Sequence, residues 1–240
     1  MSFDVEFDTT PGRDQHEEVL TVRYGDGRAE TMRLHEYERV YAVPGLYEQV
    51  VQERLECASP RRLADTLIDA VRAAGGGPGD LRGFDLGAGN GVVGDELAAR
   101  GVDVQVASDN IAAAREAAER DRPGLYAEYL VGELTDWERL AGLVADRRLN
   151  LLTAAGALGR GHVPSQDFTR LWGLFPPGSW LAITVAERLA QPGDGDIGDW
   201  LAATEAGGDT EIVRREPFRH RLTMAGEPIT YLVVVGRRRG

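Results

Sequence analysis

The stretch Phe84-Asp85-Leu86-Gly87-Ala88-Gly89-Asn90-Gly91 decides the fold of this chain. Apolar residues lead to an acid and three alternating glycines, and a helical pattern follows over residues 94–100. This order predicts a strand, a tight turn and a helix. Glycines lack a Cβ, so the backbone of such a turn approaches a ligand closely, and the next helix directs its first amides into the same space. We therefore expect a ligand site at the end of this strand.

Strands and helices alternate along the chain after residue 81. Beyond the first strand, which ends at Asp85, strands are predicted at 102–107, 125–131, 149–154 and 180–185, followed by 212–224 and 229–235. Alternation with helices indicates parallel strands joined by right-handed crossovers. The last two strands flank a Gly- and Pro-containing turn and form an antiparallel hairpin. The expected fold class is α/β, a doubly wound, mostly parallel seven-stranded sheet with a C-terminal antiparallel hairpin.

The residues ahead of the sheet are predicted to form a separate unit, 1–58, with the main domain spanning 59–240. Residues 1–16 show no clear period and indicate an extended arm. The segments 19–24 and 29–34 flank a Gly/Asp turn and predict a β-hairpin. Two helical segments follow, broken at Pro44-Gly45. We expect this hairpin and helical cap to cover the main domain as a lid.

Composition excludes several classes of function. A formal net charge of −12 leaves no broad basic face for nucleic acid. No apolar run approaches the roughly 20 residues that span a membrane, so a cytoplasmic location is expected. Cys57 is the only cysteine, and the four histidines show no ligand spacing, so no disulfide or metal site is predicted. A small-molecule partner is expected, and a homodimer stays open.

Two cofactor classes use a glycine turn of this kind. Gly89-Asn90-Gly91-Val92-Val93-Gly94 matches the dinucleotide fingerprint G-x-G-x-x-G. From Asp85 onward the same residues spell D-x-G-x-G-x-G, which resembles the first motif of class I S-adenosylmethionine (SAM) methyltransferases. The resemblance extends over residues 60–236 in the order of elements and implies a Rossmann-like fold with SAM as cofactor. An acid at Asp85 suits a sulfonium amino acid better than a pyrophosphate.

Ligands of open α/β sheets bind beyond the carboxyl ends of the strands, so the residues that end each strand should form the site. The resemblance implies that Asp109 accepts hydrogen bonds from ribose and that Glu133 meets the adenine. The alternatives are a helix N-cap for Asp109 and a charge at a helix N-terminus for Glu133. The full set of expected cofactor contacts is Asp85, Gly87, Ala88, Gly89, Asn90, Gly91, Asp109, Asn110, Glu133, Leu134, Thr153 and Ala154.

Methyl transfer requires an aligned nucleophile and, for a hydroxyl or a protonated amine, a base. His162, in the loop after the fourth strand, is the candidate catalytic base, although a loop histidine that only packs is an equal alternative. The expected acceptor contacts are Tyr37, Tyr41, Tyr47, His162 and Trp200, with a purely structural aromatic core as the alternative for the tyrosines.

Three functions follow from these patterns. The first is a SAM-dependent methyltransferase that acts on an oxygen or nitrogen of a small molecule by in-line displacement. The chain lacks an Asn/Asp-Pro-Pro-Tyr motif and an acid cluster for a divalent metal, which argues against the family's subgroups that carry them. The second is an NAD(P)-dependent oxidoreductase, and the third is a SAM-binding protein without transfer activity.

Overall fold

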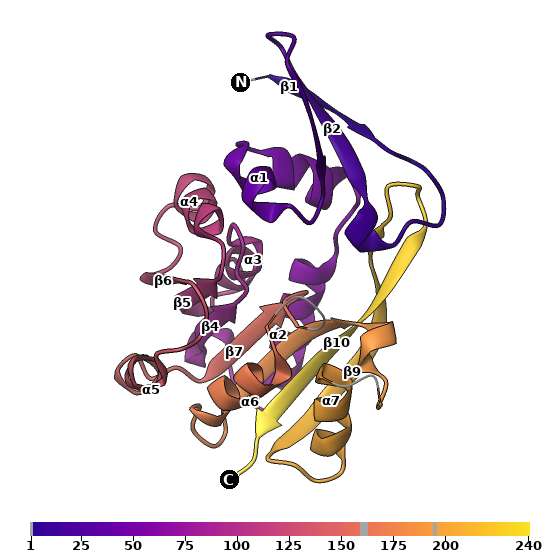
Figure 1. Cartoon of the computed structure of the whole chain (residues 1–240). Helices are drawn as coiled ribbons and strands as arrows, with labels where there is room; N and C mark the ends of the chain where they lie inside the picture. The colour runs from indigo at the N-terminus through magenta and orange to yellow at the C-terminus, as the bar shows by residue number, and fades with distance from the viewer. Residues whose placement is uncertain (1, 159–162, 194–195) are drawn as a thin grey trace.

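The main sheet has seven strands in the order β6-β5-β4-β7-β8-β10-β9. A computed structural model describes residues 2–158, 163–193 and 196–240 (Figure 1). Strands β4 to β8 are parallel, and β10 runs antiparallel to both β8 and β9, which confirms the predicted fold. The strands are β4 (Arg82–Leu86), β5 (Asp103–Asp109), β6 (Glu128–Val131), β7 (Leu151–Ala155), β8 (Trp180–Ala186), β9 (Thr210–Leu222) and β10 (Pro228–Arg238).

Helices cover both faces of this sheet. One face packs on α2 (Ser59–Ala73) and α3 (Val92–Ala98). The other packs on three helices, α5 (Trp137–Asp146), α6 (Ser165–Gly173) and α7 (Ile197–Glu205). Every residue of β8 is buried, as expected for a strand covered on both sides. No helix in the described part of the chain is long and apolar enough to cross a membrane.

The third strand is shorter than predicted. β6 begins at Glu128, whereas the apolar pattern indicated a start at residue 125. Leu125 and Tyr126 instead lie in the loop after α4 (Ala112–Asp121), where their side chains pack over Gly91 and Gly94 of the glycine turn. Apolar residues in this segment therefore cover the turn instead of extending the sheet.

The N-terminal unit contains a three-stranded antiparallel sheet, β1-β2-β3, so the prediction of an extended arm ahead of a hairpin is wrong for residues 3–7. Its strands are β1 (Phe3–Phe7), β2 (Val19–Tyr24) and β3 (Ala29–Arg33), with a short helix η1 (Gln15–Glu17) between β1 and β2. Phe3, Val5 and Phe7 alternate with Asp4 and Glu6, so one side of β1 packs on the cap core when the strand pairs with β2.

Two helical segments complete the cap, with the predicted break at Pro44-Gly45 between them. They are α1 (Tyr37–Ala42) and a π-helical segment, η2 (Glu48–Arg54). α1 packs on α4, and the apolar core of the cap includes Met224 from the turn between β9 and β10. Figure 1 shows this turn rising beside β2. The cap is therefore held over the carboxyl ends of the parallel strands from two sides. Short helices η3 (Pro78–Asp80) and η4 (Glu187–Ala190) flank the strands.

Candidate functional site

A cavity of about 750 Å³ lies between the cap and the carboxyl ends of the parallel strands, where the switch-point rule predicts a ligand. Its walls come from the glycine turn, the ends of β5, β6 and β7, the cap, the start of α2 and the β9–β10 hairpin. The predicted site residues that line it are Gly87, Ala88, Gly89, Asn90, Asp109, Asn110, Glu133, Leu134, Tyr37, Tyr41 and Tyr47.

The glycine turn has the conformation that the sequence predicts. Gly87, Gly89 and Gly91 have φ values of 67°, 55° and 90°, a region that residues with a Cβ adopt only with strain. The amides of Gly87 and Ala88 donate to the carbonyl of Ser108 at 2.8 and 3.0 Å, which ties the turn to the end of β5. The alternating left-handed residues therefore bring bare backbone to the cavity wall over residues 87–90, while Gly91 faces the loop after α4.

Two buried polar atoms beside the turn lack a partner. Asn90 Oδ1 and Ser108 Oγ have no hydrogen-bond partner among the described residues, and both side chains line the cavity. Their residues are 1% and 2% exposed. An unsatisfied buried polar group costs free energy, which a ligand that bonds it would recover. The two atoms therefore fit a polar ligand seated on the glycine turn.

Asp109 ends β5 and is not the N-cap of α4, which is Ile111. Its carboxylate accepts from the Gly89 amide at 2.9 Å and from the Ile111 amide at 3.0 Å, so it braces the turn and the start of α4. The side chain also lines the cavity, and burial raises the pKa of its carboxyl. An ionised carboxylate has about four acceptor positions, so capacity for a ligand hydroxyl remains.

Asp85 does not line the cavity, contrary to the prediction of a direct cofactor contact. Its carboxylate is buried under the turn and accepts from Tyr126 Oη at 2.8 Å and Thr153 Oγ1 at 2.9 Å. Thr153 and Ala154 also lie below the wall, which Ala155 and the two residues after it form instead. These contacts make Asp85 a support for the turn, because its donors come from strands and loops behind the cavity.

Burial raises the pKa of Asp85 to about 6. The folded protein therefore binds this proton more tightly than the unfolded chain, in which the pKa is near 3.8. The cost of the buried charge is present above pH 6 and disappears as the pH falls towards 4. We expect the unfolding free energy of the wild type, relative to the always-neutral Asp85→Asn variant, to rise by about 2 kcal/mol from pH 7 to pH 4. Urea unfolding at several pH values measures it, and parallel profiles would contradict it.

An aromatic wall runs through the cap. The rings of Tyr37 and Tyr41 stack at 5.8 Å, and those of Tyr41 and Tyr47 lie 5.1 Å apart. The Tyr41 hydroxyl lies directly against Gly89, where a Cβ would collide with it. All three tyrosines line the cavity and pack on one another, so they belong both to the site and to the cap core.

Two predicted acceptor residues are not placed in the cavity. Trp200 lies on α7, where its partly buried ring meets Phe168 edge-on at 5.0 Å and packs against the core, and it does not line this cavity. His162 lies outside the described residues. Within the described ranges, no group of three His, Cys, Asp or Glu side chains is arranged to hold a metal ion.

The sequence reasoning missed the remaining wall. It consists of residues from the N-terminal unit, the start of α2 and the last hairpin, namely Gln15, His16, His35, Cys57, Ser59, His220, Arg221 and Tyr231. Their positions are spread over more than 200 residues and share no motif. These residues come together because the β9–β10 hairpin extends as far as the cap.

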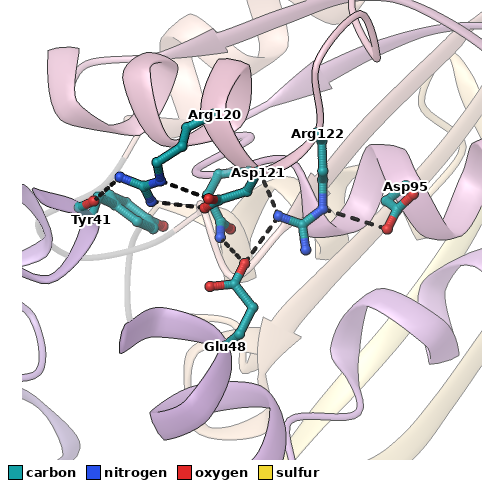
Figure 2. A network of polar contacts seen from close by, with 7 residues as sticks. Tyr41, Glu48, Asp95, Arg120, Asp121 and Arg122 are labelled. Carbon is teal, nitrogen blue, oxygen red and sulfur yellow. Dashed lines mark hydrogen bonds and ion pairs between the residues drawn. The ribbon is translucent and has the colours of Figure 1, made fainter. Parts of the chain in front are cut away.

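A polar network ties the cap to the glycine turn (Figure 2). Glu48 of η2 accepts from the side chain of Asn90 and, at 3.1 Å, from Arg122. Arg122 also donates to the Asn90 carbonyl at 2.9 Å and pairs with Asp95 of α3 at 3.5 Å. Nearby, Arg120 donates to the Tyr41 carbonyl at 3.2 Å. One carboxylate, that of Glu48, therefore joins the cap to the glycine turn.

Comparison with known proteins finds similarity at the level of fold. No family model matches the chain, and no curated protein matches its sequence. The structure of the N-methyltransferase NodS from Bradyrhizobium japonicum, in complex with S-adenosylhomocysteine (SAH), matches 86% of this chain and 98% of its own, with a TM-score of 0.56 and 14% identity. A candidate RNA methyltransferase from Pyrococcus horikoshii matches 74% of this chain and 83% of its own, with a TM-score of 0.52 and 12% identity.

Proposed function

We propose that this chain, which has the fold of the class I SAM-dependent methyltransferases, transfers a methyl group from SAM to an oxygen or nitrogen of a small molecule. One observation carries the proposal. The left-handed glycine turn, the carboxylate of Asp109 and the unpartnered Asn90 Oδ1 and Ser108 Oγ converge on one cavity at the carboxyl ends of the strands. Such a cradle fits an amino-acid nucleoside better than an apolar ligand.

The residues present fit SAM in kind and position. The backbone of residues 87–90 would hold the methionine portion, Asp109 the ribose hydroxyls, and Glu133 with Leu134 the adenine. When bound, SAM supplies an activated methyl on a sulfonium. The lining acids Asp109, Glu133 and Asp167 favour a cationic group in the cavity. The support from Asp85 is indirect, through the shape of the turn.

The size of the cavity supports a small-molecule acceptor. Its volume of about 750 Å³ lies in the range of small-molecule sites, roughly 300–1,000 Å³. The cap closes it on one side, so residues 1–58 would act as a lid that excludes water and aligns the nucleophile. The net charge of −12 works against a nucleic-acid substrate. A cytoplasmic location belongs to the same proposal.

Ligand titration tests the proposal. By isothermal calorimetry, SAM and SAH are expected to bind at least roughly 100-fold more tightly than NADH or NADPH. The reverse order would overturn it in favour of an oxidoreductase. Release of SAH during incubation with panels of hydroxyl and amine acceptors then separates a transferase from a protein that only binds SAM.

A further inference from the structure

The cavity has a second polar cluster, formed by the start of α2 with β10 and β9, the third and fourth strands from β4, and the expected cofactor contacts do not use it. Ser59 Oγ, at the start of α2, lies 2.7 Å from Nδ1 of His220 on β9. The ring of Tyr231, on β10, stacks on this imidazole with 3.9 Å between centroids and 20° between planes. Cys57 Sγ lies 3.8 Å from the same nitrogen. All four residues line the cavity.

These contacts fix the His220 ring and keep it uncharged. Burial lowers the pKa of His220 to about 3, so the imidazole is neutral at physiological pH. A neutral imidazole has one nitrogen that accepts a proton and one that carries a proton. Ser59 and Tyr231 hold the ring from its edge and its face, which leaves little freedom to turn. A pKa this low makes the imidazole a weak base, but its unprotonated nitrogen, held in the cavity wall, can accept a hydrogen bond from a ligand hydroxyl or amine.

The charges around the cluster restrict which acceptor fits. Arg221 is the only arginine among the described lining residues, and it is buried in an ion pair with Glu18 at 2.6 Å. The lining carboxylates, Asp109, Glu133 and Asp167, have no basic excess to balance them. A phosphorylated or carboxylated acceptor would therefore face carboxylates of the same negative charge, and no lining arginine would be free to pair with it.

Flat aromatic rings dominate the same end of the cavity. The ring of His35 lies 5.3 Å from that of Tyr37, and the Tyr37 ring continues into the aromatic wall of the cap. Tyr231 faces the cavity from the last hairpin. Offset stacking and edge-to-face contacts between aromatic rings favour planar ligands. The aromatic lining and the charges of this end of the cavity therefore both favour an uncharged aromatic molecule.

We propose, on the basis of the function proposed above, that this cluster is the acceptor subsite. It binds an uncharged aromatic molecule that carries a hydroxyl or amine, and the unprotonated nitrogen of His220 accepts a hydrogen bond from that group and orients it towards the methyl. In the transfer step, a bond forms between the acceptor heteroatom and the methyl carbon. The carbon–sulfur bond breaks, its electron pair stays on sulfur, and the acceptor proton is released to solvent water. Ser59 is a positioning residue, because it acts through the orientation of His220.

The test uses the small number of histidines. The chain has four, so the imidazole signals of protein labelled with ¹³C and ¹⁵N in histidine are few, and the His220→Gln variant assigns one of them. In the SAH-saturated protein, 2-naphthol is expected to bind at least roughly 10-fold more tightly than 2-naphthyl phosphate. It is also expected to shift the unprotonated ¹⁵N signal of His220. The Ser59→Ala variant should change the His220 tautomer ratio without changing SAH affinity.

Each outcome is decisive. Equal or tighter binding of the phosphate would overturn the charge argument, and 2-naphthol binding with an unchanged His220 signal would overturn the role of this residue. An unchanged tautomer ratio in Ser59→Ala would reduce Ser59 to a structural contact. SAH titration of the same samples separates the two proposals. If the wild-type protein does not bind SAH, the proposed function itself fails, and not only the proposed subsite.

Discussion

Substitution of Gly87 by alanine is expected to weaken SAH binding by at least roughly 100-fold, which is about 2.7 kcal/mol. Gly87 has a φ of 67°, and an alanine in this region costs about 1–2 kcal/mol. Its Cβ would also collide with the methyl of Ala157, in the loop after β7 that forms the adjoining wall. The turn and that loop cannot both keep their positions, and both contact the proposed cofactor. Calorimetric titration with SAH measures the loss.

Two further variants make the Gly87 result interpretable. Gly142→Ala is the matched control, because Gly142 lies in α5 with open space around its Cα and gains helix propensity from alanine. The double variant Gly87→Ala/Ala157→Gly removes the colliding methyl and should recover part of the affinity. Unchanged SAH binding by Gly87→Ala would show that the ligand does not depend on this turn, and thermal unfolding of each variant identifies loss of folding.

Loss of the Glu18 carboxylate is expected to lower the unfolding free energy by about 3–5 kcal/mol, the range for removal of one partner from a buried ion pair. Glu18 and Arg221 are 2% and 3% exposed. The carboxylate accepts from Arg221 at 2.6 Å and from the Met224 amide at 2.7 Å, so it joins the N-terminal unit to the last hairpin. The Glu18→Ala variant leaves a guanidinium buried without its counterion. Urea unfolding followed by circular dichroism measures the change.

The neighbouring Glu17, the last residue of η1, provides the control, because its side chain is exposed and Glu17→Ala should stay within about 0.5 kcal/mol of the wild type. The double variant Glu18→Leu/Arg221→Met removes both charges and should recover most of the stability, since apolar pairs often replace buried ion pairs without loss. A single Glu18→Ala variant as stable as the wild type would show that the two units are held by their apolar contacts alone.

Local patterns were sufficient wherever a short segment determines its own conformation. The glycine turn, the five parallel strands and the final hairpin were predicted because each depends on residues within about 15 positions of one another. The predictions that were wrong depended on distant partners. Residues 3–7 form a strand only because β2 is available to pair, and Trp200 packs against Phe168 instead of lining the cavity.

Asp85 illustrates the same limit inside the motif. The sequence places an acid at the end of the first strand but not the direction of its side chain. Tyr126 and Thr153 lie 41 and 68 positions away in the chain, and their hydroxyls turn the carboxylate away from the cavity. Asp85 therefore supports the turn from behind the cavity, whereas the motif suggests a direct contact with the ligand.

The sequence by itself determined the class of fold and the glycine turn that forms one end of the cavity, because alternating glycines and apolar periods constrain the backbone locally. Only the tertiary structure decided what faces the other end of the cavity. There the cap, the start of α2 and a long hairpin meet, and His220 acquires Ser59 and Tyr231 as neighbours. The burial and the contacts of His220 arise from the packing of these three elements, and no spacing within the sequence encodes them.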